Sequence, residues 1–210
     1  MPFQAAYDGE PNGLKIARDG RIVITDYRYG LMTLDPASGK VTSMLERRWS
    51  ERFKGINDLV LASNGDIYFT DQGQTGMHDP TGRVYRLRVD GTLDQIVNNV
   101  RSPNGLVLNG SEHILYVAAT RGNAIWRIPL MPDGTASKVG IFIQLSGSLG
   151  GARWPCDRRA GQPCHCSRRS WYRLDFQPPG RAALSDPLLR RARHHQRGLW
   201  RSRQQEPLHH

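Results

Sequence analysis

The sequence predicts an all-β protein of the β-propeller class, with about three blades in residues 1–151. The first observation behind this prediction is a hairpin motif that occurs three times, starting at Pro11, Ile56 and Pro103. Each copy is followed by further short apolar runs separated by turn residues. The copies lie about 45 residues apart, which is a period typical of four-stranded propeller blades.

The spacing inside the copies is the second observation. Asn12 precedes Asp26 by the same fourteen residues that separate Asn57 from Asp71. An unrelated β-sandwich with similar turns is the alternative, but it gives no reason for this spacing to repeat.

The expected strands follow from alternating apolar residues between turn signals. In the first copy they are 11–14, 22–26, the run 30–36 and 40–42. In the second copy they are 57–61, 67–71, 83–87 and 93–96. In the third copy they are 103–106, 114–118 and 124–128. Asn64 and Gly65 are expected to supply the two left-handed positions of a tight turn.

Residues 152–210 differ abruptly from the repeats. The formal net charge of the chain is +10, yet residues 1–151 are close to neutral and nearly all of the excess follows Gly151, where it consists of Arg. Periodic apolar runs also end there. A segment rich in Arg, Pro and Gly buries too little apolar surface to offset the cost of ordering. We therefore expect two parts, a partial propeller at 1–151 and a disordered basic tail at 152–210.

The change at Ala152 indicates a shift of reading frame. Back-translating residues 152–158 and shifting by one base allows Pro-Asp-Gly-Leu-Ala-Ile, which resembles the start of a further repeat. Residues 194–210 treated in this way also allow a repeat-like sequence. We hypothesise a one-base insertion near codon 152, with 152–210 the out-of-frame product of a truncated gene. Resequencing the DNA tests this, and an unambiguous in-frame read with a matching intact mass would contradict it.

Charge and hydropathy limit the classes of partner. A nucleic-acid binder is one interpretation of the net charge, but the excess lies in the tail, so we expect no selected nucleic-acid partner. That interpretation predicts salt-dependent binding that disappears when 152–210 are removed. No apolar run is long enough for a signal peptide or a membrane span, which predicts a cytoplasmic protein without a membrane partner. All three cysteines follow residue 151, so the repeats contain no disulfide.

The repeats resemble a known family in the order and content of their motifs. These motifs are EPNGL at 10–14, INDL at 56–59, YFTD at 68–71, SPNGL at 102–106 and LYV at 115–117. Together they are similar to the family of gluconolactonase, regucalcin (senescence marker protein) and luciferin-regenerating enzyme. NHL-repeat proteins, strictosidine-synthase-like proteins and paraoxonases have similar turns, so the resemblance depends on the ordered set. It implies a six-bladed propeller with one divalent cation, usually Ca²⁺, in the central channel.

The resemblance also implies which residues line the site. Asn104 corresponds to a metal-binding Asn, and Asn57 to an Asn that contacts metal or substrate. Asp58 lies beside Asn57 and is expected to contact substrate or to support Asn57. Asn12 and Asp71 are weaker candidates for lining the channel, and each Asn could instead cap a blade turn. Oxygen donors of this kind suit Ca²⁺, with Mg²⁺, Mn²⁺ and Zn²⁺ as alternatives.

The activity that the resemblance implies is metal-dependent hydrolysis of a sugar lactone or a related cyclic ester. Two residues of the family site are expected to be missing. One is an acidic ligand that would precede residue 1. The other is the Asp of a PDG motif, ligand and general base, in whose place stand Ala152, Arg153 and Trp154. We therefore expect the chain to be inactive as a lactonase and, with unpaired sheet edges, prone to aggregate. The alternative is a non-catalytic propeller that binds a ligand or a protein.

Overall fold

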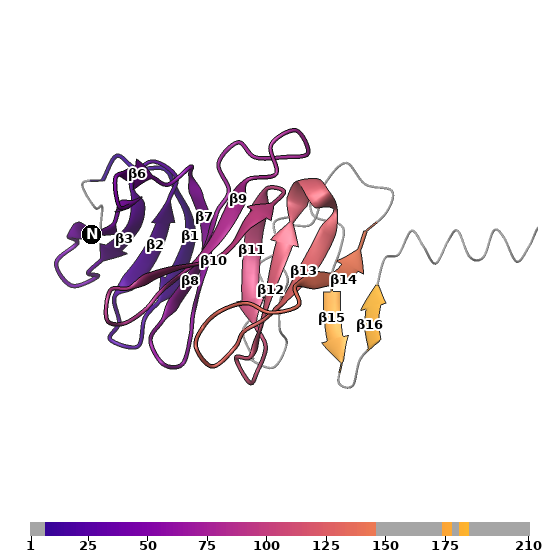
Figure 1. Ribbon diagram of the computed structural model, residues 1–210. Helices are drawn as coiled ribbons and strands as arrows, with labels where there is room; N and C mark the ends of the chain where they lie inside the picture. Colours follow the sequence, from indigo (N-terminus) through magenta and orange to yellow (C-terminus); the bar gives the residue numbers. More distant parts are fainter. Residues whose placement is uncertain (1–6, 146–173, 178–180, 185–210) are drawn as a thin grey trace, which may run out of the picture. The chain divides into compact units, whose positions relative to one another are not determined.

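A computed structural model describes residues 7–145, 174–177 and 181–184. Three four-stranded antiparallel sheets follow one another along the chain (Figure 1). The first sheet contains β1 (Pro11–Ile16), β2 (Ile22–Asp26), β3 (Gly30–Leu34) and β4 (Val41–Leu45). The second contains β7 (Ile56–Leu61), β8 (Ile67–Asp71), β9 (Gly82–Leu87) and β10 (Leu93–Val100). The third contains β11 (Pro103–Leu108), β12 (Ile114–Ala119), β13 (Ala124–Pro129) and β14 (Gly140–Gln144).

The repeat in the sequence therefore corresponds to one sheet per copy, and strand order within each sheet follows chain order. Within residues 7–145, three elements have no counterpart among the expected strands. They are β14 and the short hairpin of β5 (Arg47–Arg48) and β6 (Glu51–Arg52). The spacing could not place β14, because the connection that precedes it, from Pro129 to Gly140, is longer than its counterparts in the first two sheets.

The turn between β7 and β8 differs from the expected one. The Gly65 N–H donates to the Ala62 carbonyl (3.0 Å) and the Ala62 N–H donates to the Asp66 carbonyl (2.8 Å). Gly65 has a left-handed backbone (φ +93°), whereas Asn64 does not. This is a three-residue loop with a type I turn before the left-handed residue. The prediction that Asn64 has a left-handed backbone is therefore wrong. Asn64 Oδ1 instead accepts the Asp66 N–H (3.0 Å).

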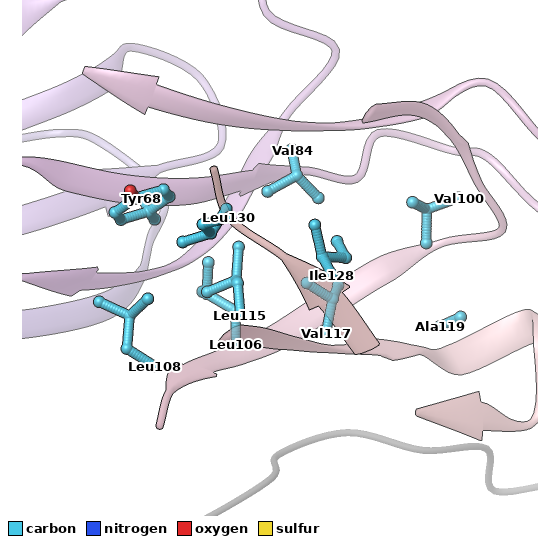
Figure 2. Packing of buried hydrophobic residues seen from close by; sticks show 10 residues of the cluster. All are labelled: Tyr68, Val84, Val100, Leu106, Leu108, Leu115, Val117, Ala119, Ile128 and Leu130. Atoms are coloured by element: carbon cyan, nitrogen blue, oxygen red, sulfur yellow. The ribbon is translucent and has the colours of Figure 1, made fainter. Parts of the chain in front are cut away.

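The second sheet is buried on both faces. On β8, Ile67 and Phe69 point toward the first sheet, where they pack with Val23 and Leu31. Tyr68, between them in sequence, points the other way. It belongs to the apolar cluster shared with the third sheet, which Figure 2 shows. Alternation on a strand with a neighbour on each side explains why β8 is buried throughout.

A carboxylate joins the turns of the second and third sheets. Glu112 accepts hydrogen bonds from the Ser63 N–H (2.9 and 3.0 Å to its two oxygens) and from the Ser63 hydroxyl (2.7 Å). Glu112 has a left-handed backbone (φ +57°), which favours glycine, and the corresponding turn positions of the first two sheets are Gly20 and Gly65. The side chain at this position thus connects two sheets at the cost of a less favourable backbone.

The chain divides into two compact units, Met1–Arg159 and Ala160–His210, a few residues beyond the expected boundary at 151. Within 152–210 the structure describes β15 (Leu174–Gln177) and β16 (Arg181–Leu184), which pair as an antiparallel hairpin where no strand was expected. The rest of this segment lies outside the described residues, so its expected disorder stays a prediction. Among the described residues, no helix has the length and hydropathy needed to cross a membrane.

Candidate functional site

A β-bulge occurs at the start of the first strand of each sheet, where the sequence has Asn. In β7, Ile56 pairs with Asp71 and Leu59 with Phe69, so two residues lie opposite Thr70 alone. β1 and β11 have register shifts at the corresponding place. A bulge bends the strand and redirects its side chains. The Asn of each sheet is therefore presented by the same local irregularity.

A cavity of about 690 Å³ lies at this end of the sheets. Asn12, Asn57 and Asn104 all line it, so the structure brings these three predicted residues together. Asn57 is buried (6% exposed), Asn104 is half-buried and Asn12 is exposed. The remaining lining comes mainly from the loops that follow β8 and β12. It comprises Tyr27, Gln72, Gly73, Gln74, Thr75, Gly76, Met77, His78, Ser102, Thr120 and Arg121.

Two of the three amides have an oxygen without a hydrogen-bond partner. Asn57 Oδ1 and Asn104 Oδ1 are both buried and accept no hydrogen bond. Leaving a buried acceptor unpaired costs about 1–3 kcal/mol, so such groups are rare in folded proteins. Their occurrence in one cavity marks a place where a ligand that accepts electron pairs would be favoured.

The backbone beside each of these amides is held by a Thr of the preceding sheet. The Thr25 hydroxyl donates to the carbonyl of Asn57 (2.7 Å), and the Thr70 hydroxyl donates to the carbonyl of Asn104 (2.8 Å). Both Thr side chains are fully buried. Each bond crosses from one sheet to the next and fixes the residue whose side chain faces the cavity.

The Asn57 amide also has a partner at its nitrogen. Asn57 Nδ2 donates to Gln72 Oε1, and Gln72 Nε2 donates to the Ser102 hydroxyl (2.6 Å). The NH₂ group is thereby directed at Gln72, which leaves Oδ1 as the free end. Gln72 and Ser102 were not among the predicted site residues. Both lie just outside strands, where no periodic pattern exists to single them out.

Asp58, predicted as a substrate contact, does not line the cavity. It is 7% exposed, and its Oδ1 accepts the N–H of Leu59 (2.9 Å). It lies against Gly13 of the first sheet, where an added Cβ would come within 2.7 Å of Asp58 Oδ1. Its position therefore connects two sheets and does not offer a carboxylate to the cavity.

Asp71, predicted to line the channel, is also not among the residues that line the cavity. It is fully buried, and its Oδ1 accepts the Gly55 N–H (3.0 Å). Its Oδ2 has no hydrogen-bond partner, and Arg83 Nη1 is 4.0 Å away. Burial raises the pKa of Asp71 to about 6, because the charged form loses its hydration and these contacts only partly compensate. Asp71 is a bracing residue at the end of β8.

The oxygen donors of the cavity are of the type that a hard cation binds, but they carry no negative charge. Neutral amide oxygens are ligands that Ca²⁺ accepts, and Asn57 and Asn104 supply two that are free. Among the described residues, no Asp or Glu lines the cavity, and no three His, Cys, Asp or Glu side chains form a cluster that could hold a metal ion. Ala152, Arg153 and Trp154, which stand where the family has the Asp of its PDG motif, lie outside the described residues. The described chain thus offers neutral ligands for a cation, without a carboxylate.

A model of the family described as the SMP-30/Gluconolactonase/LRE-like region matches residues 4–167. The chain belongs to this family. The match includes all three sheets and their Asn bulges, and it continues past the expected boundary at 151. This confirms the resemblance read from the motifs.

Named relatives of this family are lactonases. A gluconolactonase of Zymomonas mobilis is 34% identical over 128 residues, which cover 56% of this chain and 36% of the relative. Lactonase drp35 of Staphylococcus aureus is 31% identical over 140 residues, which cover 63% of this chain and 42% of the relative. The chain thus spans about two fifths of the length of these curated relatives.

Solved structures of the family have the same fold. A gluconolactonase of Xanthomonas campestris aligns with a TM-score of 0.57 at 27% identity, over 64% of this chain and 49% of that one. Regucalcin, a calcium-binding protein of Agrobacterium tumefaciens, aligns with a TM-score of 0.59 at 22% identity, over 71% of this chain and 50% of that one. The three sheets are therefore blades of a partial β-propeller.

Proposed function

We propose that the cavity is part of the divalent-cation site of a lactone hydrolase, with Asn57 and Asn104 as two of the ligands. The observation that carries the proposal is that two residues lining one cavity, Asn57 and Asn104, each have a buried amide oxygen without a hydrogen-bond partner. Membership of the gluconolactonase-like family supplies the reaction class. Ca²⁺ is the expected cation because it accepts several neutral oxygen ligands, and Mg²⁺, Mn²⁺ and Zn²⁺ are alternatives.

Each residue of the cavity has a separate role in this proposal. Asn57 and Asn104 would hold the cation without neutralising it, because amide oxygens carry no net charge. A bound cation would act as a Lewis acid toward the carbonyl of a sugar lactone or a related cyclic ester. His78 and Arg121, both exposed in the lining, would contact the polar ring of the substrate.

We further propose that the 210-residue chain is inactive as a lactonase. No carboxylate lines the described cavity, so the described residues provide no acidic ligand and no carboxylate base to activate water. The one-base insertion near codon 152 would explain this lack, since the shifted frame allows an Asp there. Calcium-dependent hydrolysis of gluconolactone by the chain as it stands would refute the proposed inactivity.

The cation site itself is tested by calorimetric titration of the 210-residue chain with CaCl₂. Asn57→Leu and Asn104→Leu approximately keep the side-chain shape and remove the amide, including its free oxygen; Asn57→Leu also removes the bond to Gln72. We expect each to weaken binding by about tenfold, the order found when a contact near a metal is lost. Asn98→Leu is the control, because Asn98 is exposed on β10 and outside the cavity lining. Equal affinities in all four proteins would refute the site.

A non-catalytic propeller that binds a small polar ligand is the second candidate. The neutral and basic lining of the described cavity favours it, because binding needs no carboxylate base. A frame-corrected and lengthened chain separates the two functions. If that chain binds no divalent cation, the scaffold is the better description.

A further inference from the structure

We infer that Gln72 is a positioning residue that decides whether Asn57 offers its oxygen or its nitrogen to the cavity. The inference deepens the proposed function, because Asn57 matters as a cation ligand only if that function holds. The hydrogen-bond arrangement behind it does not depend on the cation.

The first step concerns the direction of the Asn57 amide. A carboxamide has an accepting end and a donating end, so its neighbours determine which end faces which way. Gln72 Oε1 accepts from Asn57 Nδ2, and Asn57 Oδ1 has no partner. If the Gln72 amide were reversed, the Asn57 amide would have to reverse as well, so that Gln72 Nε2 donates to Asn57 Oδ1 and the oxygen is occupied. The orientation of Gln72 therefore controls the availability of this ligand.

The second step concerns what holds Gln72. Its Nε2 donates to the Ser102 hydroxyl (2.6 Å), and its N–H donates to the Gly55 carbonyl (3.0 Å). The Thr75 hydroxyl donates to the Gln72 carbonyl (2.6 Å) and accepts the Ser102 N–H (3.2 Å). These bonds hold the backbone of Gln72 in place beside Asn57.

The third step connects the two ligands. Ser102 is 3% exposed and has a left-handed backbone (φ +56°), an uncommon conformation for a residue other than glycine. It lies two residues before Asn104 and directly before β11. Strained residues of this kind persist where the surroundings over-determine them, often at functional sites. Gln72 thus joins the Asn57 side chain to the segment that carries the second ligand.

Three variants of the 210-residue chain test the inference. Gln72→Leu removes both hydrogen bonds. Gln72→Glu keeps an acceptor for Asn57 Nδ2 and has no donor, so it fixes Asn57 Oδ1 toward the cavity. Gln74→Glu is the matched control, because Gln74 lines the same cavity but its Nε2 donates to the Tyr27 hydroxyl (2.9 Å) and not to an Asn. The two Glu variants therefore differ in whether the new carboxylate contacts Asn57.

The first measurement is the side-chain amide signal of Asn57 in metal-free ¹⁵N-labelled protein. We expect slow hydrogen exchange of this NH₂ group in the unaltered chain and in Gln72→Glu, and fast exchange in Gln72→Leu. Dispersed backbone signals show that each variant is folded. Unchanged exchange in a folded Gln72→Leu would overturn the inference, whatever the chain does with cations.

The second measurement is titration with CaCl₂ alone. We expect Gln72→Leu to bind about tenfold more weakly, and Gln72→Glu to bind more tightly than Gln74→Glu. Equal gains in the two Glu variants would mean that added charge and not orientation determines the affinity, which would also overturn the inference. If the unaltered chain binds no Ca²⁺, the proposed function fails, and the exchange measurement still decides the role of Gln72.

Discussion

Replacing Thr70 by Val tests the bond that holds Asn104. The Thr70 hydroxyl donates to the carbonyl of Asn104 (2.8 Å) and accepts the N–H of Asp58 (3.1 Å). Val has nearly the same shape and the same β-branch, so packing and strand preference change little. The substitution leaves a buried carbonyl and a buried N–H unpaired, at about 1–3 kcal/mol each. We expect the free energy of unfolding to fall by about 2–4 kcal/mol.

Thr33 provides the matched control. It is also buried in a strand (6% exposed), but its hydroxyl has no hydrogen-bond partner. Thr33→Val therefore removes a polar group that was costly to bury and breaks no bond. We expect it to leave the free energy of unfolding unchanged or to raise it by up to about 1 kcal/mol.

Urea unfolding of the two variants, followed by circular dichroism, provides the comparison. Equal m-values would show that the transitions are comparable, so that midpoints report stability. The opposite signs are the critical result, because both variants make the same chemical change at buried positions. A Thr70→Val midpoint that equals that of Thr33→Val would refute the assigned role of the Thr70 hydroxyl.

Three further predictions concern single positions. The pKa of Asp71 is raised from 3.8 to about 6 in the folded state, so folding favours its protonated form. The contribution of this carboxyl to the free energy of unfolding is therefore fully present below pH 4 and is lost as pH rises through about 6. Urea unfolding between pH 4 and 7 should show a fall of about 2–3 kcal/mol in the unaltered chain relative to Asp71→Asn, and parallel pH curves would contradict this. Glu112→Ala should lower the free energy of unfolding by about 1–2 kcal/mol, because the bonds to Ser63 are lost. Glu112→Gly should lower it by less, because glycine tolerates the left-handed backbone at this position. Equal unfolding midpoints of the two variants would argue against the backbone effect. Gly13→Ala should lower the free energy of unfolding by about 1–3 kcal/mol, because the added Cβ would lie 2.7 Å from side-chain oxygens. Gly140→Ala is the control, because a Cβ there has nothing within 4 Å, and it should be tolerated. Thermal unfolding of the two variants provides the comparison.

The sheets could be predicted from the sequence because their turns are chemically marked. Asp19 and Asn64 each precede a left-handed Gly and accept a backbone N–H two residues on, at 3.1 and 3.0 Å. Turns of this kind are determined by a few neighbouring residues, so their spacing shows where each hairpin begins and ends. The prediction of a left-handed backbone at Asn64 was wrong, because two turn types use similar residues and differ only in their backbone angles.

The candidate site was only partly predictable, for a reason that lies in the bulges. In a regular strand, Asn57 and Asp58 would point to opposite faces, and pairing would show which one is presented. A bulge breaks this alternation, so the sequence alone could not show that Asn57 lines the cavity and Asp58 contacts the neighbouring sheet. Asp71 shared the repeat spacing, but spacing places a residue along a strand and does not determine how its carboxylate is directed.

The Thr contacts show how the fold leaves two amide oxygens free. Thr25 and Thr70 occupy the same register position in β2 and β8, and each holds the carbonyl of the Asn in the next sheet. Since the backbone is fixed by its own carbonyl, the side-chain oxygen of the Asn is not needed to hold the strand and can remain unpaired. In β12 the same position is Ala118, whose methyl group cannot donate. Among the described sheets, the bond is present at both junctions, and these present Asn57 and Asn104, the residues whose oxygens lack partners.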